Sequence, residues 1–131
     1  MDAQKKSVAE NCLAGSYGGT SDFPTVLSSL KKAGFEGYIV DYRKGTTIYF
    51  LPDGDNVELK NVKTPGAVAA EFKPGVIEAN VRKSQANAHT YPDFCANVKD
   101  AGCAGYHVSL LGKRVTYFGR TGETHVELIP A

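Results

Sequence analysis

Residues 22–38 read DFPTVLSSLKKAGFEGY, and residues 90–106 read TYPDFCANVKDAGCAGY. A shift of 68 positions places the second stretch on the first, and the same register continues on both sides. It gives 14 identical pairs among 63 aligned positions, where average residue usage predicts about four. We therefore interpret the chain as an internal duplication. The repeats span about residues 4–60 and 72–129, and a linker at 61–71 joins them into a single domain over residues 1–131.

Each repeat is predicted to begin with two helices. The second helix has apolar residues spaced i, i+3, i+4, i+7, which is typical of one buried face. These residues are Phe23, Val26, Leu27 and Leu30 in the first repeat and Tyr91, Phe94, Cys95 and Val98 in the second. Gly34 and Gly102 follow, where a helix end favours a left-handed residue. The first helix is expected over about Gln4–Ala14, with a flexible glycine-rich connection at 15–19, and its counterpart begins near Pro74.

Three short strands are predicted to follow in each repeat. Apolar and polar residues alternate from Tyr38 and from Tyr106, and Lys44-Gly45 and Gly112-Lys113 are interpreted as two-residue hairpin turns. With one inserted residue, Val57–Leu59 aligns with Val126–Leu128, so Glu58 and Glu127 are both expected to face solvent. The predicted fold is α+β, with two helix–helix–strand–strand–strand units packed about a pseudo-twofold axis and helices covering an antiparallel sheet. Either one six-stranded sheet or two related sheets would satisfy this pattern.

The composition excludes several classes of protein. Fifteen Lys and Arg against fourteen Asp and Glu give a net charge of +1, so no global field attracts nucleic acid or an anionic membrane. No stretch approaches the ~20 apolar residues of a membrane span, and no leader segment is evident. The three cysteines are an odd number without a regular spacing, which favours reduced thiols. We predict a cytoplasmic protein without a cofactor.

Several motifs resemble the YbcV-like family of prophage-derived proteins, which are often labelled phage envelope proteins. They are Ser21–Pro24, Leu30–Gly34 and Thr47–Phe50 in the first repeat, and His89–Cys95, Ala101-Gly102, Thr116–Phe118 and Val126–Pro130 in the second. The resemblance covers most of the chain from about Val8 to Pro130. It implies a small soluble protein of bacteria or their prophages with no established activity.

Tyrosines are the best candidates for a binding site. Tyr38 and Tyr106 occupy equivalent positions, as do Tyr49 and Tyr117, and Tyr42 adds a fifth ring. Tyr38 and Tyr42 share one face of their strand, and pairing with Tyr49 across a hairpin would create a phenolic surface. Such a surface could line a cleft between the repeats and hold a small ligand or a peptide. The alternative is that these rings form the core, with their hydroxyls at its rim.

Histidine is confined to the second repeat, at His89, His107 and His125. Three imidazoles could bind zinc or another transition metal, but their spacing matches no metal motif, and ordinary surface or half-buried histidines are the simpler interpretation. His89 or His107 could act as a general acid or base with Asp93 and a tyrosine. Asp93 also suits the first turn of a helix, where the dipole favours a carboxylate. Cys95 replaces Leu27 and is interpreted as a small core residue.

Two hypotheses follow, from different classes of function. The first is a non-enzymatic binding module in which an aromatic cleft between the repeats recognises a small ligand or a protein. The second is a small acid–base or hydrolytic enzyme that uses His107 or His89. An exposed edge strand also makes a homodimer possible. No nucleic-acid or membrane partner is expected.

Overall fold

The computed structural model describes residues 1–130, which form four helices and six strands. The order helix–helix–strand–strand–strand occurs twice. In chain order the elements are α1 (Ala3–Gly18), α2 (Phe23–Lys32), β1 (Gly37–Asp41), β2 (Thr46–Phe50), β3 (Asn56–Lys60), α3 (Pro74–Gln85), α4 (Tyr91–Asp100), β4 (Cys103–Ser109), β5 (Arg114–Gly119) and β6 (Thr124–Leu128). We refer to residues 1–60 as the first half and to residues 74–130 as the second half.

Helices α2 and α4 begin at side-chain caps and end at glycines, and the sequence predicts the two glycines. The Asp22 carboxylate accepts the Thr25 N–H at 3.0 Å, while Thr90 and Asp93 form a reciprocal capping box at the start of α4. Gly34 and Gly102, just beyond the two helices, have φ angles of 90° and 87°, which only glycine adopts without strain. Both predicted helix ends are confirmed.

The six strands form one continuous antiparallel sheet in the order β3-β2-β1-β4-β5-β6. Of the two arrangements left open by the sequence, the structure has the single sheet, joined through β1 and β4. The hairpin turns are longer than predicted. Asp41 pairs with Thr46 and Ser109 with Arg114, so each turn holds four residues, 42–45 and 110–113. Gly45 and Lys113, with φ angles of 75° and 52°, complete these turns.

Helix α1 is longer than predicted, because it continues through the glycine-rich segment to Gly18. After Gly18 the chain turns back onto the last turn of α1. The N–H groups of Thr20 and Ser21 both donate to the Gly15 carbonyl, at 3.0 and 3.2 Å. A β-carbon at Gly15 would lie 3.0 Å from that of Ser21. This glycine therefore permits close packing inside a helix and does not form a flexible connection.

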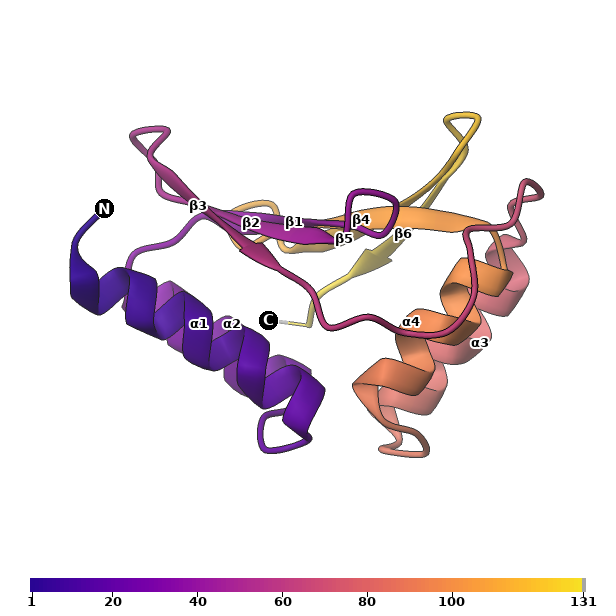
Figure 1. Ribbon diagram of the computed structural model, residues 1–131, viewed down its shortest axis with the longest axis horizontal. Helices are drawn as coiled ribbons and strands as arrows, with labels where there is room; N and C mark the ends of the chain where they lie inside the picture. The colour runs from indigo at the N-terminus through magenta and orange to yellow at the C-terminus, as the bar shows by residue number, and fades with distance from the viewer. Residues whose placement is uncertain (131) are drawn as a thin grey trace.

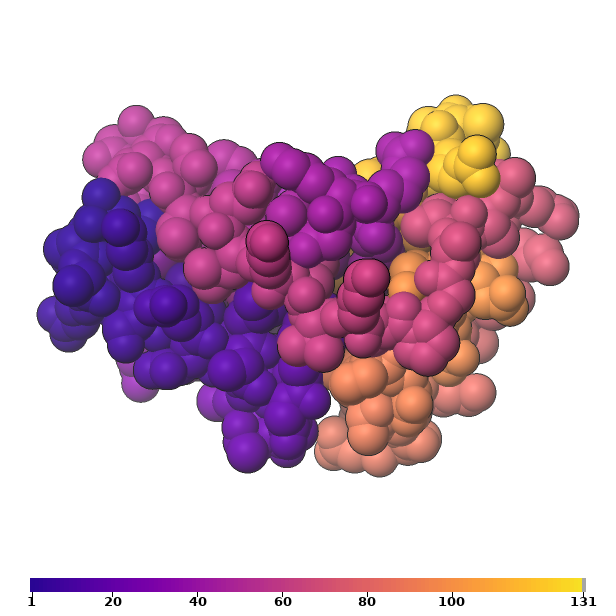
Figure 2. All heavy atoms as spheres, viewed as in Figure 1, coloured from indigo at the N-terminus to yellow at the C-terminus, as the bar shows by residue number. Residues whose placement is uncertain are grey.

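The helices cover one face of the sheet in two pairs (Figure 1). Helices α1 and α2 pack together under the first half of the sheet, and α3 and α4 pack together under the second half. The linker, residues 61–73, crosses from β3 to the second helix pair and lies on the surface across both halves (Figure 2). Within residues 1–130, no helix combines the length and the apolar character that crossing a bilayer demands.

Candidate ligand-binding groove

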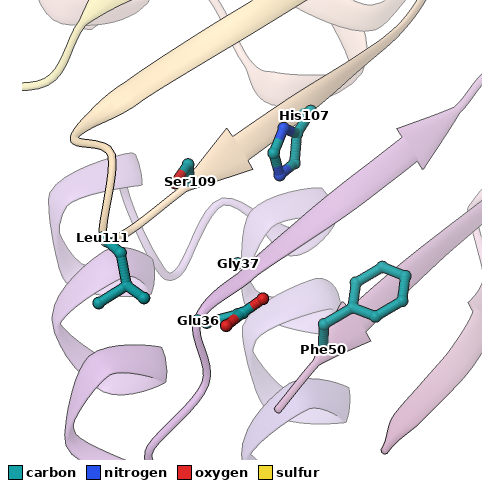
Figure 3. A pocket seen from close by; sticks show the side chains of 6 residues that line it. All are labelled: Glu36, Gly37, Phe50, His107, Ser109 and Leu111. Carbon is teal, nitrogen blue, oxygen red and sulfur yellow. The ribbon is translucent and has the colours of Figure 1, made fainter. Parts of the chain in front are cut away.

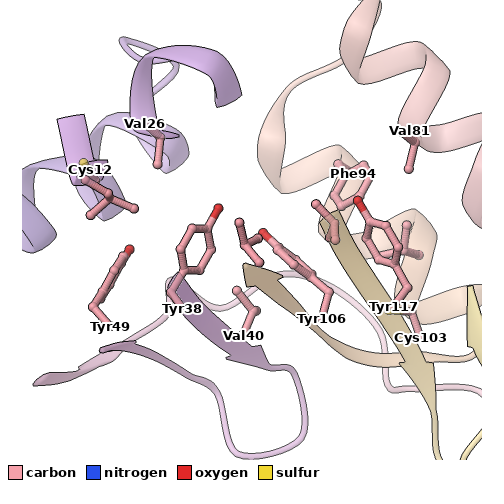
Figure 4. Close-up of a cluster of buried hydrophobic side chains, with 14 of the residues drawn as sticks. Cys12, Val26, Tyr38, Val40, Tyr49, Val81, Phe94, Cys103, Tyr106 and Tyr117 are labelled. Atoms are coloured by element: carbon pink, nitrogen blue, oxygen red, sulfur yellow. The ribbon is translucent and has the colours of Figure 1, made fainter. Parts of the chain in front are cut away.

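Four tyrosine rings stand in a row across the centre of the sheet, on the face toward the helices. Tyr49, Tyr38, Tyr106 and Tyr117 come from β2, β1, β4 and β5, in that spatial order. Successive ring centroids are 5.3, 6.3 and 5.3 Å apart. Figure 4 shows their hydroxyl groups directed toward the two helix pairs. We call these four residues the tyrosine row.

Strand pairing explains the row. Tyr38 lies directly opposite Tyr49 in the β1–β2 ladder, and Tyr106 lies directly opposite Tyr117 in the β4–β5 ladder. Side chains alternate between the faces of a strand, so tyrosines in these positions must share a face with their partners. Tyr38 and Tyr106 are diagonal neighbours across β1 and β4, so the two tyrosine pairs form one continuous row.

The tyrosine row forms the floor of a groove between the helix pairs, with a volume of about 1080 Å³. Apolar side chains form its walls: Leu13, Val26 and Leu27 on the first half, and Val81 and Phe94 on the second. Polar side chains stand around them: Asp22, Ser28 and Lys31 on the first half, and Ser84, His89, Lys113 and Glu127 on the second. Small-molecule sites typically occupy about 300–1,000 Å³ and combine apolar walls with a few polar groups. The groove has this character.

Each phenol of the tyrosine row stays protonated, because burial raises its pKa above the ordinary value of 10. The exposed fraction of each residue is between 2% and 6%. The floor therefore offers neutral O–H groups, which donate and accept hydrogen bonds. At physiological pH these groups suit recognition of a ligand better than proton abstraction.

Tyr42, the fifth predicted binding residue, lies beside the row but does not line the groove. Its hydroxyl donates to Cys95 Sγ at 3.6 Å, and the phenols of Tyr17 and Tyr91 also lie against this thiol. Cys95 has no exposed surface, and burial raises its pKa. Cys95 is a buried thiol, as the sequence predicts.

Two further tyrosines belong to this region, although the sequence placed Tyr91 only on a buried helix face and assigned no role to Tyr17. The Tyr91 and Tyr106 hydroxyls lie 2.5 Å apart, so α4 is tied to the tyrosine row. The Tyr17 and Tyr91 rings meet edge to face, with centroids 5.0 Å apart, and this contact joins α1 of the first half to α4 of the second. Tyr17 has no equivalent tyrosine in the second half, where Gln85 stands, so the repeat pattern gave no signal for it.

The pairing of β6 shows that the predicted alignment of the two third strands, β3 and β6, is wrong by one residue. Tyr49 pairs with Val57, and Tyr117 pairs with His125, so the shift of 68 positions continues without an inserted residue. A slip of one residue exchanges the two faces of a strand. His125 and Glu127 therefore face the helices, where the first half has Val57 and Leu59. The prediction that Glu127 faces solvent is wrong.

Charged groups consequently stand at the second-half side of the groove. Glu127 Oε1 accepts from Arg82 Nη1 at 2.9 Å, and Glu127 Oε2 lies 2.6 Å from His125 Nε2. The Glu127 side chain is only 12% exposed, and a buried carboxylate is stabilised by such partners. Charged groups therefore stand on both sides of the groove, with Asp22 and Lys31 on the first half and Glu127 with its partners on the second.

His89 lies in the groove and contacts a serine. Its Nε2 is 2.6 Å from Ser84 Oγ, while Nδ1 is buried without a hydrogen-bond partner among residues 1–130. Burial lowers the pKa of His89, against an opposing effect of nearby Asp93. Asp93 itself caps α4 through Thr90, and these hydrogen bonds lower its pKa.

His107 lies on the uncovered face of the sheet and does not approach the groove. It is exposed, and it lines a hollow of about 130 Å³ beside Glu36, Phe50 and Leu111 (Figure 3). This volume is below the usual range for a ligand site. Because Tyr106 and Val108 point toward the helices, the intervening His107 must point away. The three histidines therefore do not converge, and residues 1–130 contain no group of three or more potential metal ligands.

One comparison with known proteins finds a family. A family model described as "Protein of unknown function (DUF1398)" matches residues 17–127. The match includes every strand through most of β6 and all of the tyrosine row. No curated protein matches the chain.

Proposed function

Because the chain belongs to this family of proteins of unknown function, we propose its function from the groove: it binds a small, mostly apolar molecule that carries a hydrogen-bonding group. The observation that carries the proposal is the tyrosine row at the floor of a groove of about 1080 Å³. Rigid phenols supply apolar contact and a polar tip at a low entropic cost. The apolar wall near Leu13 and Leu27 would hold the apolar end of the ligand.

A fluorescent probe tests the proposal directly. We expect 1-anilinonaphthalene-8-sulfonate to bind the folded protein with 1:1 stoichiometry and to shift the amide resonances of Tyr38 and Tyr106. Leu27→Trp places a large ring on the groove wall, so it should weaken binding at least about tenfold, which corresponds to about 1.4 kcal/mol. Fluorescence titration and ¹H–¹⁵N spectra measure both effects.

Lys32→Trp is the matched control, because Lys32 is exposed on the same helix and does not line the groove. This variant should bind the probe as the parent protein does. Cooperative thermal unfolding of both variants shows that they are folded. Unchanged affinity in Leu27→Trp, or resonance shifts confined to the uncovered face around His107, would contradict a ligand site in the groove.

The Ser84–His89 contact favours a second candidate function, hydrolysis of an ester in the groove. His89 Nε2 would accept the Ser84 proton while Oγ attacks the ester carbonyl, and the proton would then pass to the departing alcohol. Water would release the acyl group from Oγ by the same route. The lowered pKa of His89 leaves its ring neutral at pH 7, which a general base requires.

We expect slow hydrolysis of p-nitrophenyl acetate, because no carboxylate orients His89 through Nδ1 within the described chain. Ser84→Ala should reduce the rate above background at least about tenfold, a lower limit for general-base assistance. The rate should rise with pH to a plateau by about pH 7, since the base form dominates above a pKa lowered from 6.5. Ser16→Ala is the control at the equivalent position of the first half, and equal rates in the two variants would exclude this activity.

Three expectations from the sequence remain proposals about origin and location. The repeated order of elements supports descent of the domain from a duplicated unit. The resemblance to the YbcV-like proteins supports a prophage origin. A cytoplasmic location rests on composition alone.

A further inference from the structure

Strand β6 lies at one edge of the sheet. Ile129 N–H donates to the Lys113 carbonyl, and Gly119 N–H donates to the Glu123 carbonyl. In an antiparallel ladder, hydrogen-bonded residues alternate, so residues 123, 125, 127 and 129 bond to β5. The N–H and C=O groups of Thr124, Val126 and Leu128 therefore point away from the sheet.

The side chains of β6 differ from those of the opposite edge strand, β3. On the uncovered face β3 presents Asn56, Glu58 and Lys60, and Glu58 also pairs with Lys44 at 2.8 Å. Charged side chains on an edge strand discourage pairing with another chain. On the same face β6 presents Val126 and Leu128, which are 45% and 73% exposed. Only β6 thus combines a free backbone edge with exposed apolar side chains.

We propose that β6 is a dimerisation surface whose partner is β6 of a second copy of this chain. Antiparallel pairing about a twofold axis at Val126 would place Val126 opposite Val126, and Thr124 opposite Leu128. All of these residues have outward backbone groups, so each pair can exchange both hydrogen bonds. The inference is independent of the proposed groove ligand.

Charge selects this register among those that the backbone permits. With the axis at Val126, His125 of each copy faces Glu127 of the other, on the side of the sheet toward the helices. An axis at His125 would place Glu127 opposite Glu123 of the second copy, and an axis at Glu127 would oppose the two Glu127 carboxylates. Like charges directly opposite one another destabilise a sheet. Among these three axes, therefore, only the twofold axis at Val126 places His125 of one copy opposite Glu127 of the other.

The surrounding charges agree with this register. Arg82, on α3, already contacts Glu127 Oε1 at 2.9 Å, and His125 Nε2 contacts Oε2 at 2.6 Å. In the dimer Glu127 would lie between Arg82 of its own chain and His125 of either copy. The nearby Glu78 also contacts Arg82, at 3.5 Å.

Sedimentation velocity of the intact protein tests the dimer. Val126→Lys would place two ammonium groups opposite one another, so we expect the dissociation constant to rise at least about tenfold. Glu58→Lys is the control at the matched position of β3, and it should leave the dimer unchanged. A parent protein that stays monomeric up to millimolar concentration, or a Val126→Lys variant that dimerises like its parent, would overturn the proposal.

Cysteine cross-linking tests the register. Opposed residues in a hydrogen-bonded pair have α-carbons about 5.5 Å apart, within the range a disulfide accepts. Val126→Cys should therefore form a covalent dimer on mild oxidation, whereas Thr124→Cys should not, since Thr124 faces Leu128. The native cysteines Cys12, Cys95 and Cys103 are all buried and should not cross-link in the parent. Preferential cross-linking of Thr124→Cys would refute the axis at Val126.

Discussion

Gly102→Ala is expected to lower the free energy of unfolding by about 2–5 kcal/mol, as the sum of two costs. Gly102 has a φ of 87°, and a residue with a β-carbon adopts such a left-handed conformation at a cost of about 1–2 kcal/mol. That β-carbon would also lie 2.6 Å from the Glu71 carbonyl carbon and 2.7 Å from the Phe72 α-carbon, and overpacking of this kind costs about 1–3 kcal/mol. Urea denaturation followed by circular dichroism measures the loss.

The linker backbone cannot easily move away from a larger residue at position 102. Lys73 N–H donates to the Ala101 carbonyl at 2.8 Å, and Ala69 N–H donates to the Lys99 carbonyl at 2.9 Å. These two bonds fix the linker on either side of Glu71 and Phe72. A domain of this size has a stability of about 5–15 kcal/mol, so Gly102→Ala should remove a large share of it.

Gly34→Ala is the matched control. Gly34 ends α2 as Gly102 ends α4, and its φ is 90°. Its β-carbon would meet only Lys5 Cε, at 4.0 Å. This variant should therefore show the strain alone, about 1–2 kcal/mol. Equal losses in the two variants would show that the linker does not pack against Gly102 as described.

These glycines illustrate which parts of the fold the sequence predicts. Turns at helix ends depend on neighbours in the chain, so Gly34 and Gly102 are assigned correctly from local chemistry. The linker contact with Gly102 depends on residues about 30 positions away and occurs in one half only. Identical residues 68 positions apart therefore predict the same turn, but they do not predict the same surroundings.

The candidate site shows the same division. The tyrosine row follows from strand alternation and hairpin pairing, which are local, so Tyr38 and Tyr49 could be placed on one surface in advance. The contacts of Tyr17 with Tyr91, and of Ser84 with His89, join elements whose packing no spacing rule determines.

The third strands show a different kind of error. Matching Val57–Leu59 to Val126–Leu128 required an inserted residue, whereas the β5–β6 ladder keeps one register from Thr124 to Leu128. Ladder geometry determines which face each residue occupies, and similarity of residue type does not. The corrected register is what places His125 and Glu127 beside the groove and leaves Val126 and Leu128 exposed.

Lys99→Met is the second substitution with a large expected effect, and it is compared with Lys31, the lysine 68 positions earlier. Lys99 is buried, and its Nζ donates to the carbonyls of Thr64 and Gly66 at 3.0 and 3.1 Å. Methionine keeps the apolar stem but removes the donors. A hydrogen bond from a charged group contributes about 1.5–3 kcal/mol, and the loss of two is partly offset because a buried charge is also removed. We expect a net destabilisation of about 2–4 kcal/mol, measured by urea denaturation.

Lys31→Met is the control, because Lys31 occupies the equivalent position of α2 but is exposed at the groove. Its loss should change stability by less than about 0.5 kcal/mol. The linker provides a second readout, since Lys63, followed by Thr64, is a trypsin site present in both variants. If Lys99 holds the linker to α4, cleavage at Lys63 should accelerate in Lys99→Met alone. Equal cleavage and equal stability in the two variants would mean that the linker is held by its backbone hydrogen bonds, and that the ammonium group of Lys99 contributes nothing to the joining of the two halves.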